Sequence, residues 1–393
     1  MLNSIRKLEK RILKEDRNKY KRYLLKSIDF TAPIVGIIGQ RGVGKSTLLI
    51  QYANLLKKIY EPYKSLYFSY DYANNIDINL FDLAKELHKV GAEYLVIDKI
   101  EKFQNFEKDL AKIHEILPYI KIIFSASSIF LQKSDIIKLY HLKGLSYREF
   151  LEIKLNIELP SFTLSEILND SIYIANKLED KFTPLEYFNE YLLYGYYPFY
   201  FNKQDNFIKE LNSVINYTID IDLLNLGLVK VNFLDKLKQL LILIAKSGPS
   251  SINITDIASE LEVSRNSVYA YLNHLESCGL IHSVLNSNKS KSKLSKPEKV
   301  YLNNTNLPYC LSIEEKMEIV RETFFVSQLK GNCYIKMNSQ GDFLLNDKHI
   351  FEVGIKNREL NQTQIEDNRY LAIDTDTTED KFKIPLWLFG FLY

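Results

Sequence analysis

A phosphate-binding loop is the clearest chemical motif in this sequence. Residues 39–47 have the sequence GQRGVGKST and match the pattern GxxxxGK[ST] at every fixed position, between an expected strand and an expected helix. Glycines in such a loop let successive backbone N–H groups turn inward around a phosphate, and the following helix adds its positive N-terminal dipole. The predicted nucleotide-binding residues are Gly39, Gln40, Arg41, Gly42, Val43, Gly44, Lys45, Ser46 and Thr47.

Side chains in and near this loop are expected to bind ATP and Mg²⁺. The Lys45 ammonium would contact β- and γ-phosphate oxygens, and the Ser46 hydroxyl would bind Mg²⁺. A second Mg²⁺ ligand is expected from an aspartate at the end of an adjacent apolar strand, where Asp98 follows the run YLVI. Ser125 and Ser127, at the end of the next apolar run, either contact the γ-phosphate or cap the strand.

The residue that should activate water is missing next to Asp98. In NTPases with an extra strand between the loop strand and the aspartate strand, a glutamate usually follows the aspartate and acts as general base. Lys99 stands there in this chain, and a cation cannot accept the proton. Three hypotheses stay open: a nucleotide-binding switch with weak or lost hydrolysis, an active ATPase with Glu101 as base, and a DNA-binding protein with structural nucleotide.

The elements that must position these residues alternate between strand and helix. Short β-rich runs end near residues 39, 70, 98 and 125, and helix-forming stretches lie between them. This alternation predicts an α/β fold over residues 31–158, a P-loop NTPase parallel sheet with helices on both faces. Its ligand is expected at the carboxyl ends of the strands. Arg148 either acts in trans on nucleotide or forms a local ion pair with Glu149 or Glu152, and we favour the ion pair.

Four further segments are expected around this domain. Residues 1–30 contain a basic amphipathic helix that packs on the domain behind it, or a basic arm that contacts phosphates. Residues 159–233 are helical and rich in aromatic side chains, and we interpret them as a lid or connector. Residues 234–303 have the element order of a winged helix-turn-helix. Residues 304–393 are expected to form a C-terminal α+β domain.

The expected winged helix offers polar side chains for DNA. Its second helix, residues 265–277, would enter the major groove, and a lysine-rich hairpin tip would contact phosphates. The alternative is a spacer between domains with a solubilising loop. The candidate DNA contacts are Arg265, Asn266, Ser267, Tyr269 and Asn273 on the helix, and Lys289, Lys291, Lys293, Lys296 and Lys299 on the hairpin.

Composition and charge argue against several classes of binding partner and site. The 51 Lys and Arg residues against 49 Asp and Glu residues leave a net charge of +2, which gives no global basic field for nucleic acid or anionic membranes. The longest apolar stretches fall short of the ~20 residues that span a bilayer. The 3 cysteines are far apart, which excludes a disulfide framework and a CxxC metal site. We expect a cytoplasmic protein without membrane contact, and its oligomeric state stays open.

Nearly the whole chain resembles prokaryotic AAA+-type ATPases that carry a C-terminal domain of uncharacterised function. The resemblance lies in GQRGVGKST (39–47), YLVIDKIEKF (94–103), IIFSASS (122–128), LKGLSYREF (142–150), LLYGYYPFY (192–200), RETFF (321–325), GDFLL (341–345), FEVGIKN (351–357) and IPLWLFGFLY (384–393).

Three departures from that family pattern all affect hydrolysis. The resemblance implies Asp-Glu where this chain has Asp98-Lys99, and Thr-Gly-Ser-Ser where residues 125–128 are SASS. It also implies an Arg-Arg pair before the LSxREF segment, whereas residues 131–142 contain no arginine. The phosphate loop is intact, so the resemblance implies a nucleotide-binding protein with weakened turnover.

In the similar family, the C-terminal domain is likened to restriction-type nuclease folds, with a metal site of Asp followed by Glu-x-Lys. The matching residues here are Asp342, Glu352 and Lys356, with Glu322 on a preceding helix, but the position two after Glu352 is Gly354. In a strand, Glu352 and Lys356 share a face yet lie two pleats, about 13 Å, apart. We therefore expect a vestigial nuclease-like site and a structural or protein-binding role for this domain.

Overall fold

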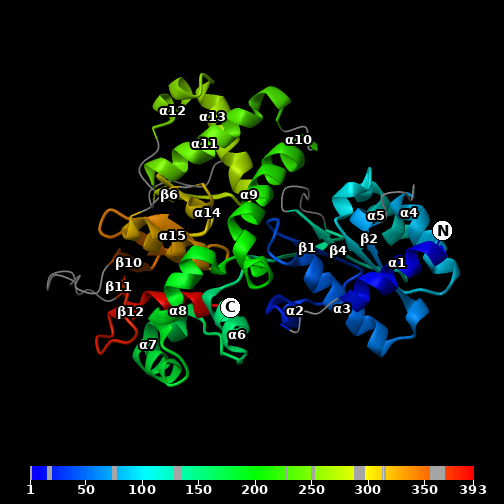
Figure 1. Cartoon of the computed structure of the whole chain (residues 1–393), viewed down its shortest axis with the longest axis horizontal. Helices are drawn as coiled ribbons and strands as arrows, with labels where there is room; N and C mark the ends of the chain where they lie inside the picture. Colours follow the sequence, from blue (N-terminus) through cyan, green and yellow to red (C-terminus); the bar gives the residue numbers. More distant parts are fainter. Residues whose placement is uncertain are drawn as a thin grey trace. The chain divides into compact units, whose positions relative to one another are not determined.

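The computed structural model (Figure 1) describes residues 2–15, 20–72, 78–127, 135–225, 229–248, 253–286, 297–311, 313, 316–354 and 368–393. The chain forms two compact units, Met1–Gly144 and Leu145–Tyr393. The first unit ends at Gly144, whereas the domain expected from the sequence runs to residue 158. The physical reason is that α6 (Tyr147–Leu155) packs against η10 (Leu386–Phe391) at the far end of the chain.

The first unit is built on five parallel strands in the order β2-β3-β4-β1-β5. Strands β1 to β4 are apolar runs with almost every residue buried, as a sheet covered on both faces requires. The predicted α/β fold with a parallel sheet is confirmed. Strand β5 was not predicted, because its run KLYH is short and half polar. The bounds are β1 (Ile34–Ile38), β2 (Ser65–Ser69), β3 (Tyr94–Asp98), β4 (Lys121–Ala126) and β5 (Lys138–His141).

Helices cover both faces because of the order in which the strands are joined. The chain crosses from β1 to β2 through α3 (Lys45–Ile59) and returns from β2 to β4 through α4 (Leu80–Lys89) and α5 (Phe106–Ile116). Right-handed crossovers that run in opposite directions place their helices on opposite faces, which Figure 1 shows. Shorter helices complete the unit: α2 (Leu24–Ser27), η1 (Pro62–Lys64), η2 (Tyr70–Tyr72) and η3 (Ile100–Lys102).

The N-terminal helix α1 (Leu2–Glu15) packs on α3 and on the edge strand β2. The Glu9 carboxylate of this helix is buried, and its Oε1 accepts a hydrogen bond of 2.8 Å from the backbone N–H of Tyr67. The same oxygen lies 2.9 Å from Nζ of Lys57. Burial lowers the pKa of Lys57, and the hydrogen bond with Glu9 opposes that shift. Helix α1 thus satisfies a backbone donor on an edge strand with a buried ion pair.

The second unit contains a sheet in the order β12-β11-β10-β9-β8-β6-β7. Its bounds are β6 (Ile281–Asn286), β7 (Lys299–Leu302), β8 (Ile335–Met337), β9 (Phe343–Leu345), β10 (His349–Gly354), β11 (Arg369–Ile373) and β12 (Lys383–Pro385). Strand β6 pairs with β7 on one side and with β8 on the other. The hairpin of residues 234–303 is therefore continuous with the sheet of residues 304–393, and these two expected domains form a single unit because backbone hydrogen bonds join them.

The helices of the second unit form two groups along the chain, one before residue 234 and one from residue 234 onward. The first group contains α6, α7 (Leu164–Glu179), α8 (Pro184–Glu190), η4 (Tyr191–Gly195), η5 (Pro198–Asn202), η6 (Gln204–Asn206), α9 (Phe207–Tyr217), η7 (Thr218–Asp222), α10 (Leu223–Asn225) and η8 (Val231–Phe233). The second contains α11 (Leu234–Ser247), α12 (Ile254–Glu260), α13 (Arg265–Ser277), α14 (Leu307–Cys310), α15 (Met317–Leu329) and η10. Helix α13 packs on α11, α12 and β6.

The buried ion pair of Glu9 generates a stability prediction. Glu9→Gln should lower the free energy of unfolding by about 2 kcal/mol, because Lys57 keeps its charge and loses its anionic partner. Glu86→Gln is the matched control, since the pair of Glu86 and Lys89 is exposed and should contribute less than about 0.5 kcal/mol. Urea unfolding followed by circular dichroism measures both. Equal losses in the two variants would contradict the role given to Glu9.

Candidate functional site

The phosphate loop joins β1 to α3 and has the backbone shape that its glycines permit. Gly42 and Gly44 have left-handed φ angles of 82° and 98°, which glycine adopts without strain. Gly39 has no room for a side chain, because a Cβ there would lie 2.2 Å from the carbonyl oxygen of Leu142. Nζ of Lys45 donates hydrogen bonds of 2.7 and 2.9 Å to two carbonyl oxygens of the loop, those of Gly39 and Gln40.

Three predicted residues from different elements meet at the carboxyl edge of the sheet. Asp98 ends β3 and is buried, with 4% of its surface exposed. Its Oδ1 accepts hydrogen bonds from the hydroxyl of Ser46 on α3 at 3.0 Å and from that of Ser125 on β4 at 2.6 Å. Strand β4 lies between β3 and β1, so this is the class of sheet with an extra strand between the loop strand and the aspartate strand.

The donor atoms of this group fit Mg²⁺. One carboxylate and one hydroxyl, from Asp98 and Ser46, are hard oxygen ligands, and Mg²⁺ is usually held by few protein oxygens together with phosphate oxygens. Within the described ranges, the Oγ of Ser127 and both amide atoms of Gln40 are buried without a hydrogen-bond partner. Because buried polar atoms are nearly always satisfied, these atoms mark an edge that suits a polar ligand.

Lys99 occupies the position of the expected base. Its side chain is paired on the side of β3 that lies away from the phosphate loop. Its backbone is left-handed (φ 63°), and its N–H donates to Oγ of Ser125 at 2.9 Å. Its ammonium forms an ion pair with Asp71, which follows β2. Strand β2 lies on one side of β3, whereas β4 and the loop strand β1 lie on the other. Glu101 lies on η3, three residues beyond Asp98.

The partner of Lys99 was missed as a functional residue although the sequence held a signal for it. Asp71 is predicted at the carboxyl end of the strand SLYFSY, the edge where ligands bind in such sheets. No pattern in the sequence shows that its carboxylate and the Lys99 ammonium meet, since the two residues come from adjacent strands 28 positions apart.

Arg148 is buried in the second unit, and the predicted local ion pair is confirmed. Its Nη1 lies 2.9 Å from Oε1 of Glu152, and its other contacts are hydrogen bonds to the carbonyl oxygens of Leu159 and Tyr393. Glu149 does not pair with it and instead forms a capping box with Ser146 at the start of α6. Arg148 is buried, with 7% of its surface exposed.

The residues predicted to contact DNA are partly described. On α13, the side chains of Arg265, Asn266 and Asn273 are exposed and Tyr269 is half-buried, while the opposite face is buried in the core. Lys299, at the start of β7, lies 3.1 Å from Oε2 of Glu322 and is half-buried. The lysines at 289, 291, 293 and 296 lie outside the described residues.

The carboxylates of the expected nuclease-like site already have partners. Oε1 of Glu352 lies 3.8 Å from a guanidinium nitrogen of Arg369, and both side chains are buried. Oδ2 of Asp342 accepts a hydrogen bond of 2.8 Å from the N–H of Val353. Lys356 lies outside the described residues. In the described part of the chain, no group of three or more His, Cys, Asp or Glu side chains could hold a metal ion.

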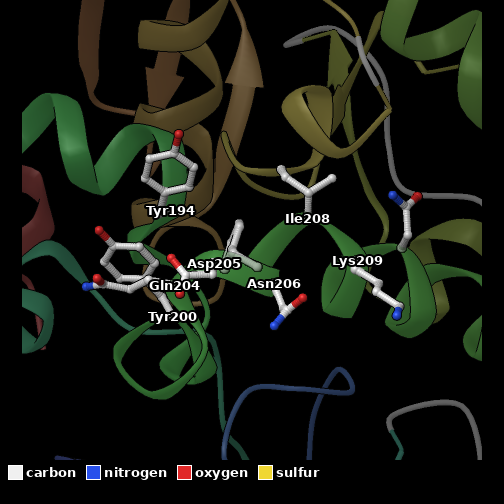
Figure 2. Close-up of a pocket in the computed structure, with 9 residues that line it drawn as sticks. Tyr194, Tyr200, Gln204, Asp205, Asn206, Ile208 and Lys209 are labelled. Carbon is white, nitrogen blue, oxygen red and sulfur yellow. The ribbon is translucent and has the colours of Figure 1, made fainter.

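A hollow of about 720 Å³ opens on the surface of the second unit (Figure 2). It was not predicted. The rings of Tyr194 and Tyr200 stack beside it with centroids 5.3 Å apart, and both pack edge-on against Phe207. The other lining residues are Gln204, Asp205, Asn206, Ile208, Lys209 and Asn212.

Among the described helices, none is long and apolar enough to cross a membrane.

Comparisons with known proteins agree with the phosphate-loop geometry. A family model described as an AAA domain matches residues 31–151, and a second model, a domain of unknown function (DUF8612), matches residues 185–316. The uncharacterized protein MJ1637 of Methanocaldococcus jannaschii is 24% identical over 304 residues, which cover 74% of this chain and 63% of that protein. The chain thus spans less than two thirds of the length of this relative.

Two solved structures align with the chain at low similarity. The STAND protein with a tetratricopeptide repeat sensor, PH0952 from Pyrococcus horikoshii, has 16% identity and a TM-score of 0.27, over 80% of this chain and 46% of that one. AMPPCP-bound DnaA from Aquifex aeolicus has 17% identity and a TM-score of 0.23, over 69% of this chain and 88% of that one. Similarity at this level adds no argument about function.

Proposed function

We propose that the protein binds ATP with Mg²⁺ as a conformational switch and hydrolyses it slowly or not at all, a proposal supported by the match of residues 31–151 to a family model described as an AAA domain. One observation carries this proposal. The phosphate loop and Asp98 are intact and correctly joined, while the next side chain is the cation Lys99, paired with Asp71.

Binding follows from the loop and the sheet edge. Backbone N–H groups of the loop and the N-terminus of α3 attract phosphate oxygens, and Lys45 supplies a flexible positive charge beside them. Ser46 and Asp98 would hold Mg²⁺, which neutralises phosphate charge when it is bound. Ser125 fixes the orientation of Asp98 through its hydrogen bond of 2.6 Å, so the carboxylate is positioned before a ligand arrives.

Slow hydrolysis follows from the chemistry of Lys99. A general base must accept a proton from the attacking water, and an ammonium has no lone pair with which to do so. The ion pair with Asp71 also holds this side chain toward β2, on the side of β3 away from the phosphate loop. The site therefore retains groups for phosphate binding and lacks a base at the usual position.

Nucleotide binding is the first prediction of this proposal. Wild-type protein should bind ATP with Mg²⁺ in isothermal titration calorimetry, and Lys45→Ala should weaken that affinity by at least about tenfold, since a charge-assisted hydrogen bond is lost. Lys58→Ala, an exposed lysine on the same helix, should bind as wild type does. Removal of Mg²⁺ with EDTA should weaken the wild-type affinity. A wild-type protein that binds no nucleotide would overturn the proposed function.

The second prediction concerns the missing base. Lys99→Glu should raise Mg²⁺-dependent ATP hydrolysis on the order of 10²-fold, because a carboxylate then stands at the base position and is repelled by Asp71 from the β2 side. Lys102→Glu, which makes the same charge change on η3, should leave the rate at the wild-type level. Phosphate release measures both variants. Rapid hydrolysis by wild type that Glu101→Gln abolishes would establish the alternative, an active ATPase with Glu101 as base.

A second candidate function, DNA binding through α13, is favoured by the exposed polar face of that helix. Arg265→Ala combined with Asn266→Ala should weaken binding of a labelled DNA duplex by about tenfold in fluorescence anisotropy, with a steep dependence on salt. Ser277→Ala, at the other end of α13, is the control and should change nothing. Wild type without duplex affinity would support the alternative that residues 234–303 serve as a spacer.

A further inference from the structure

A buried arginine from the N-terminal segment contacts the phosphate loop. Nη1 of Arg22 donates a hydrogen bond of 2.6 Å to the carbonyl oxygen of Val43, in the middle of the loop. Nη2 donates to the carbonyl oxygens of Lys143 and Gly144 at 2.8 and 2.9 Å. Arg22 is 5% exposed, so these charge-assisted bonds form away from water, where they are strongest.

The carbonyls of Lys143 and Gly144 belong to the segment that leads out of the first unit. This unit ends at Gly144, and the second begins at Leu145. The peptide between them is bound at both of its polar atoms. Its carbonyl oxygen accepts from Arg22, and its N–H, that of Leu145, donates to the carbonyl oxygen of Tyr196 at 2.8 Å. One guanidinium therefore bonds to the phosphate loop and to the joining peptide at once.

We propose that Arg22 is a positioning residue that couples the phosphate loop to the Gly144–Leu145 peptide, so that nucleotide binding restrains the chain where it passes into the second unit. This inference rests on the proposed nucleotide binding. It assigns a role to a residue outside the phosphate-loop motif.

Peptide geometry explains how a bond behind the loop affects phosphate binding. In a trans peptide, the C=O and N–H groups point in opposite directions. A guanidinium that holds the Val43 carbonyl therefore also orients the N–H of Gly44, the residue just before α3. Phosphates bind to such N–H groups, so a bound phosphate and Arg22 fix the same peptide from its two sides.

A second contact joins the phosphate loop directly to residues 142–144, without Arg22 between them. Gly39, at the start of the loop, lies so close to Leu142 that a Cβ would be 2.2 Å from its carbonyl oxygen. The N–H of Leu142 donates to the carbonyl oxygen of Ile38 at 2.8 Å. The start and the middle of the loop are therefore both linked to residues 142–144, the start by close packing of Gly39 and the middle through Arg22, so a shift of this segment would disturb the loop.

The test combines nucleotide affinity with amide hydrogen exchange of the full-length chain. Wild type, Arg22→Gln and Arg22→Lys are compared with and without Mg²⁺ and a non-hydrolysable ATP analogue. The control is Arg6→Gln, because Arg6 also donates to three backbone carbonyls of the first unit, those of Pro62, Tyr63 and Ser65, far from the phosphate loop in sequence.

In wild type, the nucleotide should slow exchange of the amides at 144 and 145 by about tenfold or more, since Arg22 binds the carbonyl oxygens of the two peptides to which these amides belong. Arg22→Gln should weaken affinity by about tenfold and make this exchange insensitive to nucleotide. Arg22→Lys keeps the positive charge but loses the planar guanidinium that binds several carbonyls at once. It should bind nucleotide more tightly than Arg22→Gln but should not recover the exchange response. Arg6→Gln should match wild type in both measurements.

The outcomes separate this inference from the function on which it rests. A wild type that binds no nucleotide overturns the proposed function, and the coupling with it. A wild type that binds nucleotide with unchanged exchange at 144 and 145 overturns the coupling alone. The same holds if Arg22→Gln binds as tightly as Arg6→Gln. Should Arg22→Gln not fold, Arg22→Lys decides, and a wild-type exchange response in that folded variant refutes the role of Arg22.

Discussion

Two hydroxyl groups that share one carboxylate oxygen determine the chemistry of the first unit. Ser46 lies in the first turn of α3, Ser125 lies near the end of β4, and both donate to Oδ1 of Asp98 at the end of β3. A parallel sheet makes this possible, because the carboxyl ends of all its strands lie at one edge. The buried carboxylate is held in one orientation, and the phosphate loop is held beside it by the start of α3.

In the function we propose, the charge next to this carboxylate allows nucleotide binding without rapid hydrolysis. Mg²⁺ and phosphate need fixed oxygens, N–H groups and a mobile lysine, and all of these come from the loop and Asp98. Activation of water needs one further group that accepts a proton. Lys99 cannot accept it and is paired with Asp71 on the β2 side. This combination of groups is the basis of the nucleotide switch that we propose.

Several sequence motifs of the second unit supply residues that pack in its core. The segment LSYREF places Tyr147 and Phe150 in an aromatic cluster, where the Tyr147 ring lies 5.2 Å from that of Phe188 and 5.4 Å from that of Tyr191. Gly390 allows the close approach of η10, since a Cβ there would lie 2.4 Å from Cβ of Tyr147. Arg148 joins the same cluster to the carbonyl of Tyr393. These motifs contribute side chains to a shared core.

The sequence by itself determined the parallel sheet and the phosphate loop, with Ser46 on the helix after the loop and Asp98 at a strand end. These features depend on local patterns, because glycine spacing, apolar strands and the residue at a strand end act within a few positions. Only the tertiary structure decided the end of the first unit, the single sheet formed by the hairpin and the C-terminal strands, and the partners of Lys99 and Arg22. Those features depend on backbone carbonyls and charged groups brought together from distant segments, and no residue type or spacing encodes which distant carbonyl an arginine will bind.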